Sequence, residues 1–71
     1  MINLEIKNGY GRVKVGNREY SVSQIDGLWN LRCQDYSGKY LVDFYIVENK
    51  KRLSTIQKYA DKYEINIQEV K

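Results

Sequence analysis

The chain has 71 residues, of which twelve are basic and nine acidic, and its net charge is +3. A chain of this length holds a single domain, residues 1–71, and it has no run of about 18 apolar residues that could span a membrane. Its single cysteine rules out an internal disulfide, and its N-terminus has neither signal-peptide nor transit-peptide character, so we expect a cytoplasmic protein.

Turn-forming dipeptides divide the first two thirds of the chain. They are Asn8-Gly9, Gly16-Asn17, Asp26-Gly27 and Ser37-Gly38. Each fits a two-residue hairpin loop, because Gly, Asn and Asp tolerate the positive φ that such loops require. The segments between them, residues 2–7, 10–15, 18–25, 28–36 and 39–47, are rich in β-branched and aromatic residues. The sequence therefore predicts a five-stranded antiparallel β-meander.

Two-residue loops fix the register of this meander, since a slip of one residue would turn every side chain to the other face. The predicted cross-strand pairs are Leu4–Val13, Ile2–Val15, Val13–Tyr20, Tyr20–Cys33, Val22–Leu31, Cys33–Val42, Leu31–Phe44 and Trp29–Ile46. One face is then apolar, with Ile2, Leu4, Ile6, Val13, Val15, Tyr20, Val22, Trp29, Leu31, Cys33, Val42, Phe44 and Ile46. The other face is mainly polar and includes Asn30.

An apolar sheet face needs a cover, and residues 50–65 predict one. Apolar residues recur there at helical spacing, at Leu53, Ile56, Tyr59, Ala60 and Tyr63. We expect an α+β fold in which this C-terminal amphipathic helix packs on the sheet. The helix begins either after an Asn49 cap or at a capping box of Ser54 with Gln57, and residues 65–70 form a short sixth strand or fray.

The sequence lacks the usual residues of catalysis. It has no histidine, its carboxylates are scattered, and its glycines fall in turns instead of a phosphate-binding loop. The predicted register turns Cys33 inward, where a free thiol behaves as a small hydrophobic group. We therefore expect no enzyme activity, no cofactor and no metal site.

Nucleic acid is one candidate partner. On the outer face of the sheet the expected neighbours have opposite charges, in the pairs Glu5–Arg12, Lys14–Glu19 and Arg32–Asp43, which cancel the field that a phosphate backbone would meet. The positive charge that remains gathers at the start and on the solvent side of the helix. Its residues, Lys50, Lys51, Arg52, Lys58 and Lys62, form the candidate nucleic-acid site or simply a solvated helix face.

Two segments resemble DNA-binding modules. Residues 26–63, DGLWNLRCQDYSGKYLVDFYIVENKKRLSTIQKYADKY, resemble the three strands and helix of the arm-site DNA-binding domain of tyrosine recombinases. Residues 60–70, ADKYEINIQEV, are similar to the first helix and turn of a helix-turn-helix, with Glu64 in place of the usual turn glycine. The first resemblance implies a strand-and-helix unit that contacts DNA, and neither one identifies residues that read bases.

A protein partner is the leading hypothesis. The predicted register leaves an apolar patch on the outer face, formed by Ile25, Leu28, Leu41, Tyr45 and Val47, and such a patch is typical of a protein-binding surface or a homodimer contact. Tyr10, Tyr36 and Tyr40 lie at or beside turns. The abundance of Asn, Ile, Lys and Tyr resembles proteins of low-GC bacteria or their phages. The expected function is a small protein-binding inhibitor of a host nucleic-acid machine, of the anti-CRISPR or another anti-defence type; the alternative is a small DNA-binding accessory protein.

Overall fold

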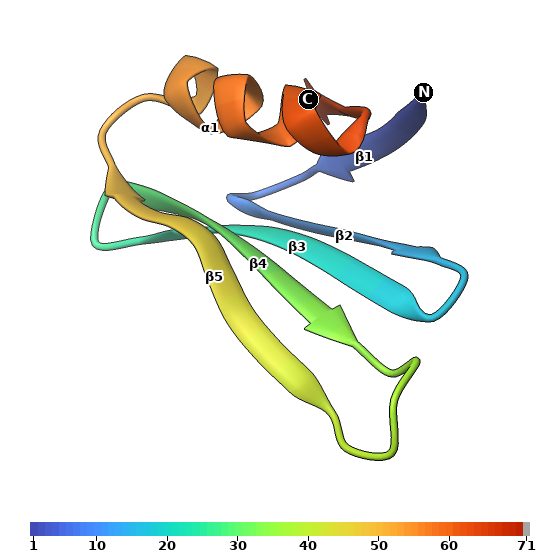
Figure 1. Ribbon diagram of the computed structural model, residues 1–71. Helices are drawn as coiled ribbons and strands as arrows, with labels where there is room; N and C mark the ends of the chain where they lie inside the picture. Colours follow the sequence, from blue (N-terminus) through green and yellow to red (C-terminus); the bar gives the residue numbers. More distant parts are fainter. Residues whose placement is uncertain (71) are drawn as a thin grey trace.

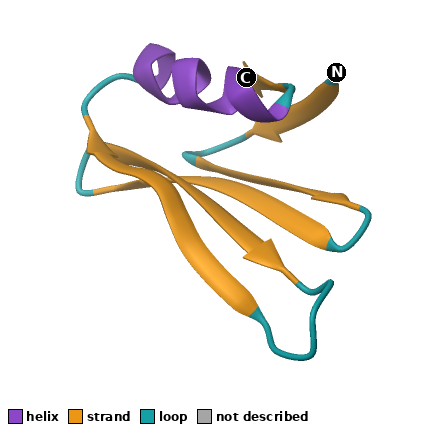
Figure 2. Ribbon diagram, in the orientation of Figure 1, coloured by secondary structure: helices purple, strands orange, loops and turns teal. Residues whose placement is uncertain are grey.

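The computed structural model describes residues 1–70, which form an α+β domain (Figures 1 and 2). Six strands, one α-helix and one 3-10 turn follow one another along the chain. They are β1 (Ile2–Ile6), β2 (Tyr10–Val15), β3 (Arg18–Ile25), β4 (Leu28–Asp35), β5 (Val42–Lys50), α1 (Leu53–Ala60), η1 (Asp61–Tyr63) and β6 (Ile65–Glu69). The predicted combination of a meander and a C-terminal helix is confirmed in this coarse form.

The prediction of five meander strands is wrong. The antiparallel sheet has four strands in the order β2-β3-β4-β5, and β1 pairs in parallel with β6 instead. The Asn8-Gly9 turn does start a hairpin, because the backbones of Lys7 and Tyr10 exchange hydrogen bonds of 2.9 and 3.2 Å. The strand β1 then leaves β2, and its residues pair with β6 from Ile2–Ile65 to Ile6–Glu69. The predicted sixth strand therefore exists, and β1 is its partner.

Gly11 allows β1 to pass directly over β2. A Cβ atom at this position would lie 2.1 Å from the carbonyl oxygen of Glu5, a distance that no side chain could accept. The backbone of β1 thus lies against the face of β2 at Gly11, whereas in a meander the two strands would lie side by side with their side chains above and below the sheet. This close approach turns Leu4 and Ile6 into the core, where both are fully buried.

The central registers are as predicted, and the last one is not. Val13 pairs with Tyr20, and Val22 pairs with Leu31. Between β4 and β5, however, the six residues 36–41 form the connection, in place of a two-residue loop at Ser37-Gly38. Cys33 consequently faces Phe44 instead of Val42.

Two irregularities in β5 change its register further. Leu31 faces Val47 and Trp29 faces Lys50, so the expected pairs Leu31–Phe44 and Trp29–Ile46 do not form. The second irregularity lies beside Asn30, which is buried although the sequence placed it on the outer face. A polar side chain at this depth needs partners, and the backbone beside it supplies them.

The helix buries the predicted stripe. Ile56 and Ala60 are fully buried, and Leu53, Tyr59 and Tyr63 pack against the core at partial exposure. Both predicted starts are wrong, because α1 begins at Leu53 with Arg52 at the N-cap position and no side-chain cap. The remaining core residues are Leu4, Ile6, Tyr20, Val22, Trp29, Leu31, Cys33, Val47 and Ile65.

The two resembling segments differ from the modules that they resemble. Residues 26–63 contain two strands and the helix, β4, β5 and α1 with η1, where the arm-site domain has three strands before its helix. Residues 60–70 contain the end of α1, η1 and β6. A strand therefore stands where a helix-turn-helix would turn toward its second helix.

Candidate protein-binding surface

The β4–β5 hairpin is an arm that extends away from the helix. Figure 1 shows α1 over the end of the sheet where β5 finishes, while the loop between β4 and β5 reaches out on the other side. The principal extents of the molecule, 35 × 24 × 21 Å, reflect this elongated shape. Because α1 covers only one end of the sheet, apolar side chains on the arm have no cover.

Most of the exposed large apolar side chains lie on this arm. We call Tyr36, Tyr40 and Leu41, which lie in the loop, the tip cluster; Tyr40 is the most exposed of the three, at 75%. Val42, Phe44 and Tyr45 follow at the start of β5 and are exposed as well. The sequence placed Val42 and Phe44 on the covered face, and their exposure corrects that prediction. The alternating pattern revealed which face they share, but not how far the helix would reach along it.

The predicted outer-face patch does not form one surface. Ile25 and Leu28 pair with each other at the turn between β3 and β4, at the opposite end of β4 from the loop that contains Leu41. Tyr45 lies on the arm beside Arg32. The prediction for Val47 is wrong, because the irregularity in β5 turns this side chain inward and leaves it only 7% exposed.

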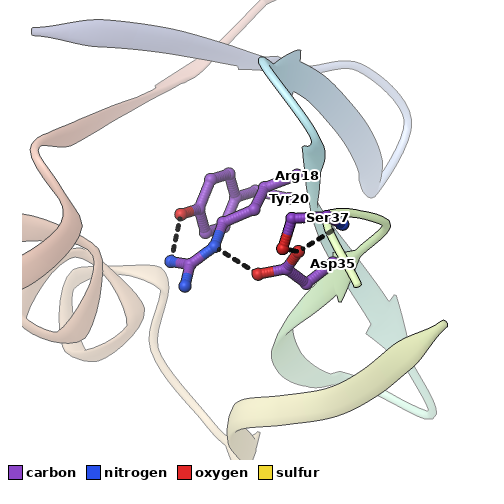
Figure 3. A network of polar contacts seen from close by, with 4 residues as sticks. All are labelled: Arg18, Tyr20, Asp35 and Ser37. Atoms are coloured by element: carbon purple, nitrogen blue, oxygen red, sulfur yellow. Dashed lines mark hydrogen bonds and ion pairs between the residues drawn. The ribbon is translucent and has the colours of Figure 1, made fainter. Parts of the chain in front are cut away.

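A polar network secures the end of β4, where the loop of the arm begins (Figure 3). The Arg18 Nε donates to Asp35 Oδ2 at 2.8 Å, and its Nη1 donates to the Tyr20 hydroxyl at 3.2 Å. The other Asp35 oxygen accepts the backbone N–H of Ser37 at 2.9 Å and its hydroxyl at 2.5 Å. These bonds from Ser37 and Arg18 lower the pKa of Asp35 to about 2. The network fixes the direction in which the chain leaves β4.

The loop is also fixed to the neighbouring hairpin. The backbone N–H of Tyr36 donates to the carbonyl oxygen of Asn17 at 2.7 Å, and the ammonium group of Lys14 lies 6.0 Å from the centre of the Tyr36 ring. The tip cluster therefore begins at a position held by two adjacent turns, which reduces the entropy lost when a partner binds.

The outer face of the arm is electrically balanced. Arg32 forms a two-bond ion pair with Asp43, in which Nε donates to Oδ1 at 2.7 Å and Nη2 donates to Oδ2. This pair lowers the pKa of Asp43. The Arg32 guanidinium also lies 6.0 Å from the centre of the Tyr45 ring. The predicted Arg32–Asp43 pair is thus confirmed.

The other two predicted charge pairs turn out differently. Lys14 and Glu19 are cross-strand neighbours, as predicted, but the ion pair of Glu19 is with Arg12, at 4.0 Å. The expected Glu5–Arg12 pair does not form, because β1 leaves the sheet and pairs with β6.

The candidate nucleic-acid residues occupy two places. Lys50 ends β5, and Lys51 and Arg52 lead into α1; Lys51 and Arg52 are exposed. Lys58 and Lys62 line an open hollow on the helix together with Thr55 and Tyr59, and the Lys62 ammonium lies 5.6 Å from the Tyr59 ring centre. The three ion pairs found within residues 1–70 involve none of these five cations.

Comparisons of the chain with protein-family models, curated proteins and solved structures find no match. No helix within residues 1–70 is long and apolar enough to cross a membrane. In the same range, no three of the side chains that commonly bind metals come together in a group that could hold an ion.

The predicted burial of Cys33 is confirmed. Its side chain is fully buried between the strands, and this burial raises the pKa of the thiol. A protonated thiol without access to solvent is a poor nucleophile. Cys33 thus contributes to the core, and the surface features that remain for function are the arm and the two basic groups.

Proposed function

We propose that the protein is a small non-enzymatic module that binds a larger protein through the tip cluster of its β4–β5 arm. The observation that supports this proposal is the exposure of Tyr36, Tyr40 and Leu41 on a loop whose first residues are held by Asp35 and Asn17. Several exposed apolar groups on one loop are typical of protein interfaces, and tyrosine is enriched among residues that dominate binding energy.

The partner in this proposal is a host nucleic-acid machine, and the protein acts as a phage or mobile-element inhibitor of the anti-CRISPR or another anti-defence type. This narrower statement rests on the size and composition of the chain. A small, rigid arm with an apolar end is suited to filling a pocket on a larger enzyme, since a preorganised loop loses little conformational entropy on binding.

Affinity capture from the source cells tests the proposal. The bait is the wild-type protein, and the lysate is treated with nuclease so that proteins tethered through nucleic acid are lost. The double variant Tyr40→Ala, Leu41→Asp removes the tip cluster, and we expect it to lose the captured protein. The captured protein is then purified, and direct binding is measured with both forms of the bait.

Ile25→Asp is the matched control. Ile25 is 55% exposed and Leu41 is 51% exposed, but Ile25 lies at the other end of the sheet. This variant should bind like the wild type. Equal binding by the tip-cluster variant and the wild type, with both folded, would overturn the proposed site.

A specific observation supports the alternative function, DNA binding through the basic helix start. Arg52 occupies the N-cap of α1 without a capping bond, a position where Ser, Thr, Asp or Asn would stabilise the helix by about 1 kcal/mol. A cation there also opposes the helix dipole. Because Arg52 is exposed and destabilises the helix, its presence suggests a role in binding and not in folding.

Substitution of this group separates the alternative from the leading proposal. Replacing Lys50, Lys51 and Arg52 by Ser should abolish a salt-sensitive mobility shift with duplex DNA if that group binds phosphates. A shift that persists in this variant would exclude the group as the contact. Binding to the captured protein should be unaffected by the same change.

A further inference from the structure

The open hollow on α1 and η1 brings three polar side chains together around one aromatic ring. It is lined by Thr55, Lys58, Tyr59 and Lys62, which recur at the three- and four-residue spacing that places side chains on one face of a helix. Its volume is about 290 Å³, close to the lower end of the range of about 300–1,000 Å³ for small-molecule sites. The hollow is therefore large enough to hold a small ligand.

The cations of this hollow have no anionic partner within residues 1–70. Lys58 and Lys62 take part in none of the three ion pairs found there. Neither their ammonium groups nor the Thr55 hydroxyl takes part in the side-chain hydrogen bonds of the same range. Asp61, which lies between the two lysines in the sequence, accepts a hydrogen bond from Gln57 instead. Like charges four residues apart repel each other on a helix, and an anion in the hollow would neutralise both.

The Tyr59 ring positions one of the two cations. The Lys62 ammonium lies 5.6 Å from the centre of this ring, within the range of a cation–π contact. The ring is half-buried and packs against the core, so its own position is fixed. A cation held in this way loses less conformational freedom when an anion binds.

We propose that this hollow binds a phosphate monoester. At neutral pH a monoester has three terminal oxygens and between about 1.5 and 2 negative charges, which match two ammonium groups and one hydroxyl. Lys58 and Lys62 each neutralise one charge, and the Thr55 hydroxyl donates to the remaining oxygen. A carboxylate or a phosphodiester has one negative charge and two free oxygens. Either of these would leave one cation of the hollow without a partner.

The site goes beyond the proposed function, because it lies on the helix and uses no residue of the tip cluster. It also differs from the basic helix start, whose expected ligand is the phosphodiester backbone of DNA. The Tyr59 ring forms an apolar wall beside the two lysines. A monoester with a flat organic group, such as a mononucleotide, should therefore bind more tightly than inorganic phosphate.

Titration of the isotope-labelled protein, followed by NMR at constant ionic strength, tests the site. With inorganic phosphate and with thymidine monophosphate we expect saturable shifts of the amide signals of Thr55, Lys58, Tyr59 and Lys62. Acetate and dimethyl phosphate carry one charge each and should bind about five-fold more weakly, the difference made by one exposed ion pair. Equal affinities for dimethyl phosphate and thymidine monophosphate would overturn the proposal.

Lys58→Gln and Lys62→Gln each remove one cation from the hollow. Each should weaken the binding of thymidine monophosphate about five-fold, and the double variant should show no saturable binding. Lys39→Gln is the matched control: Lys39 is exposed and its ammonium lies 5.8 Å from the centre of a tyrosine ring, but it belongs to the β4–β5 loop. Its affinity should equal that of the wild type. Unchanged binding by the folded double variant, or an equal loss in the control, would overturn the site.

Thr55→Val tests the third contact, because it removes the hydroxyl and keeps a β-branched side chain of the same shape. It should weaken the binding of thymidine monophosphate and leave the binding of acetate unchanged. An equal loss for both ligands would contradict the match between three donors and three terminal oxygens.

Oligothymidylates identify the source of the monoester. A terminally phosphorylated strand presents the group at a strand end, and thymidine monophosphate presents it as a free nucleotide, so the tighter of the two shows which source the hollow prefers. The same strand without its terminal phosphate contains only phosphodiesters. Binding of this strand to the hollow with the affinity of the phosphorylated one would overturn the proposal.

Two double variants separate this proposal from the proposed function. Lys58→Gln, Lys62→Gln should lose thymidine monophosphate and still bind the captured protein. Tyr40→Ala, Leu41→Asp should bind thymidine monophosphate and lose the captured protein. Failure of one result leaves the other proposal standing.

Discussion

The side chain of Asn30 holds the backbone of Asn49. Its Oδ1 accepts a hydrogen bond from the Asn49 N–H at 3.0 Å, and its Nδ2 donates to the carbonyl oxygen of Leu28 at 3.2 Å. Asn49 has a positive φ of 61°, an uncommon conformation for a residue with a side chain. The two bonds thus stabilise the second irregularity of β5, directly before the chain turns toward α1.

Asn30→Ala should therefore destabilise the fold. The variant leaves the Asn49 N–H without its partner in a half-buried position, a loss that costs about 1–3 kcal/mol. Urea unfolding, monitored by the fluorescence of Trp29, measures the change in the free energy of unfolding. Asn3→Ala is the control: Asn3 is exposed, its side chain only accepts a 3.4 Å bond from Asn66, and its loss should cost less than about 0.5 kcal/mol. Equal losses in the two variants would contradict the role of Asn30.

Local patterns predict the centre of this fold well. The pairs Val13–Tyr20 and Val22–Leu31 follow from two-residue turns, and the positive φ values of Gly16, Asp26 and Gly27 show that these turns form as their sequences indicate. The helix stripe is equally local, since residues three and four apart share a face. Burial of Cys33 follows from the same alternation.

The predictions are wrong where residues far apart in the sequence, or the local backbone geometry, determine which strands pair and in which register. Ile2 near the N-terminus pairs with Ile65 near the C-terminus, and no local turn sequence predicts this pairing. Gly38 has no positive φ, so Ser37-Gly38 belongs to a longer loop. The irregularities of β5 depend on Asn30, whose buried bonds the alternating pattern does not reveal.

The same two causes explain which residues of the candidate site were predicted correctly and which were not. Leu41 and Tyr45 were predicted as surface residues and are exposed, whereas Val47 is buried because the register changes between Tyr45 and Val47. The exposure of Val42 and Phe44 depends on how far α1 extends over the sheet. Helix length and position are tertiary properties that the apolar stripe does not specify.

Gly11→Ala should be strongly destabilising. The added Cβ would lie 2.1 Å from the Glu5 carbonyl oxygen, and both groups belong to backbone that cannot move without separating β1 from β2. Overpacking of this kind costs about 1–3 kcal/mol or more. Gly38→Ala is a matched control, because its nearest neighbour would be 3.8 Å away and its φ is not positive. Thermal unfolding of both variants should show a large fall only for Gly11→Ala, and similar melting temperatures would refute the close approach.

Acid should weaken the junction between β4 and the loop through Asp35. Its folded-state pKa of about 2 lies below the unfolded value of about 3.9, because Ser37 and Arg18 favour the carboxylate. A lowered pKa contributes stability that is present above the unfolded pKa and disappears as the pH falls through the folded one. The contribution is therefore lost between about pH 4 and pH 2.

Denaturant midpoints measured from pH 2 to pH 5 test this window. Asp35→Asn should unfold more easily than the wild type at pH 5, and the two proteins should converge near pH 2. Ser37→Ala removes one of the two Ser37 bonds and should reduce the slope in part. Some pH dependence will remain in Asp35→Asn, since Arg32 also lowers the pKa of Asp43. A slope unchanged from the wild type in Asp35→Asn would be inconsistent with the network.

Gln57 joins the helix to the strand that follows it. Its Nε2 donates to the carbonyl oxygen of Ile65 at 2.9 Å, and its Oε1 accepts the N–H of Ile67 at 2.8 Å. A second bond from Nε2 reaches Asp61 Oδ1 at 2.6 Å. The side-chain amide of Gln57 thus makes the hydrogen bonds that a neighbouring strand would make, along the edge of β6 that faces away from β1.

Replacing Gln57 by Leu should loosen β6 while α1 stays intact, because Leu is a good helix former. The lost bonds to half-buried backbone cost about 1–3 kcal/mol, and hydrogen exchange at the Ile67 amide should accelerate more than exchange in β3. Gln68→Leu makes the same substitution at an exposed position of β6 and should leave both measurements near the wild-type values. If exchange at Ile67 is equally slow in Gln57→Leu and in the control, β6 depends on its pairing with β1 alone and the bridging role of Gln57 is refuted.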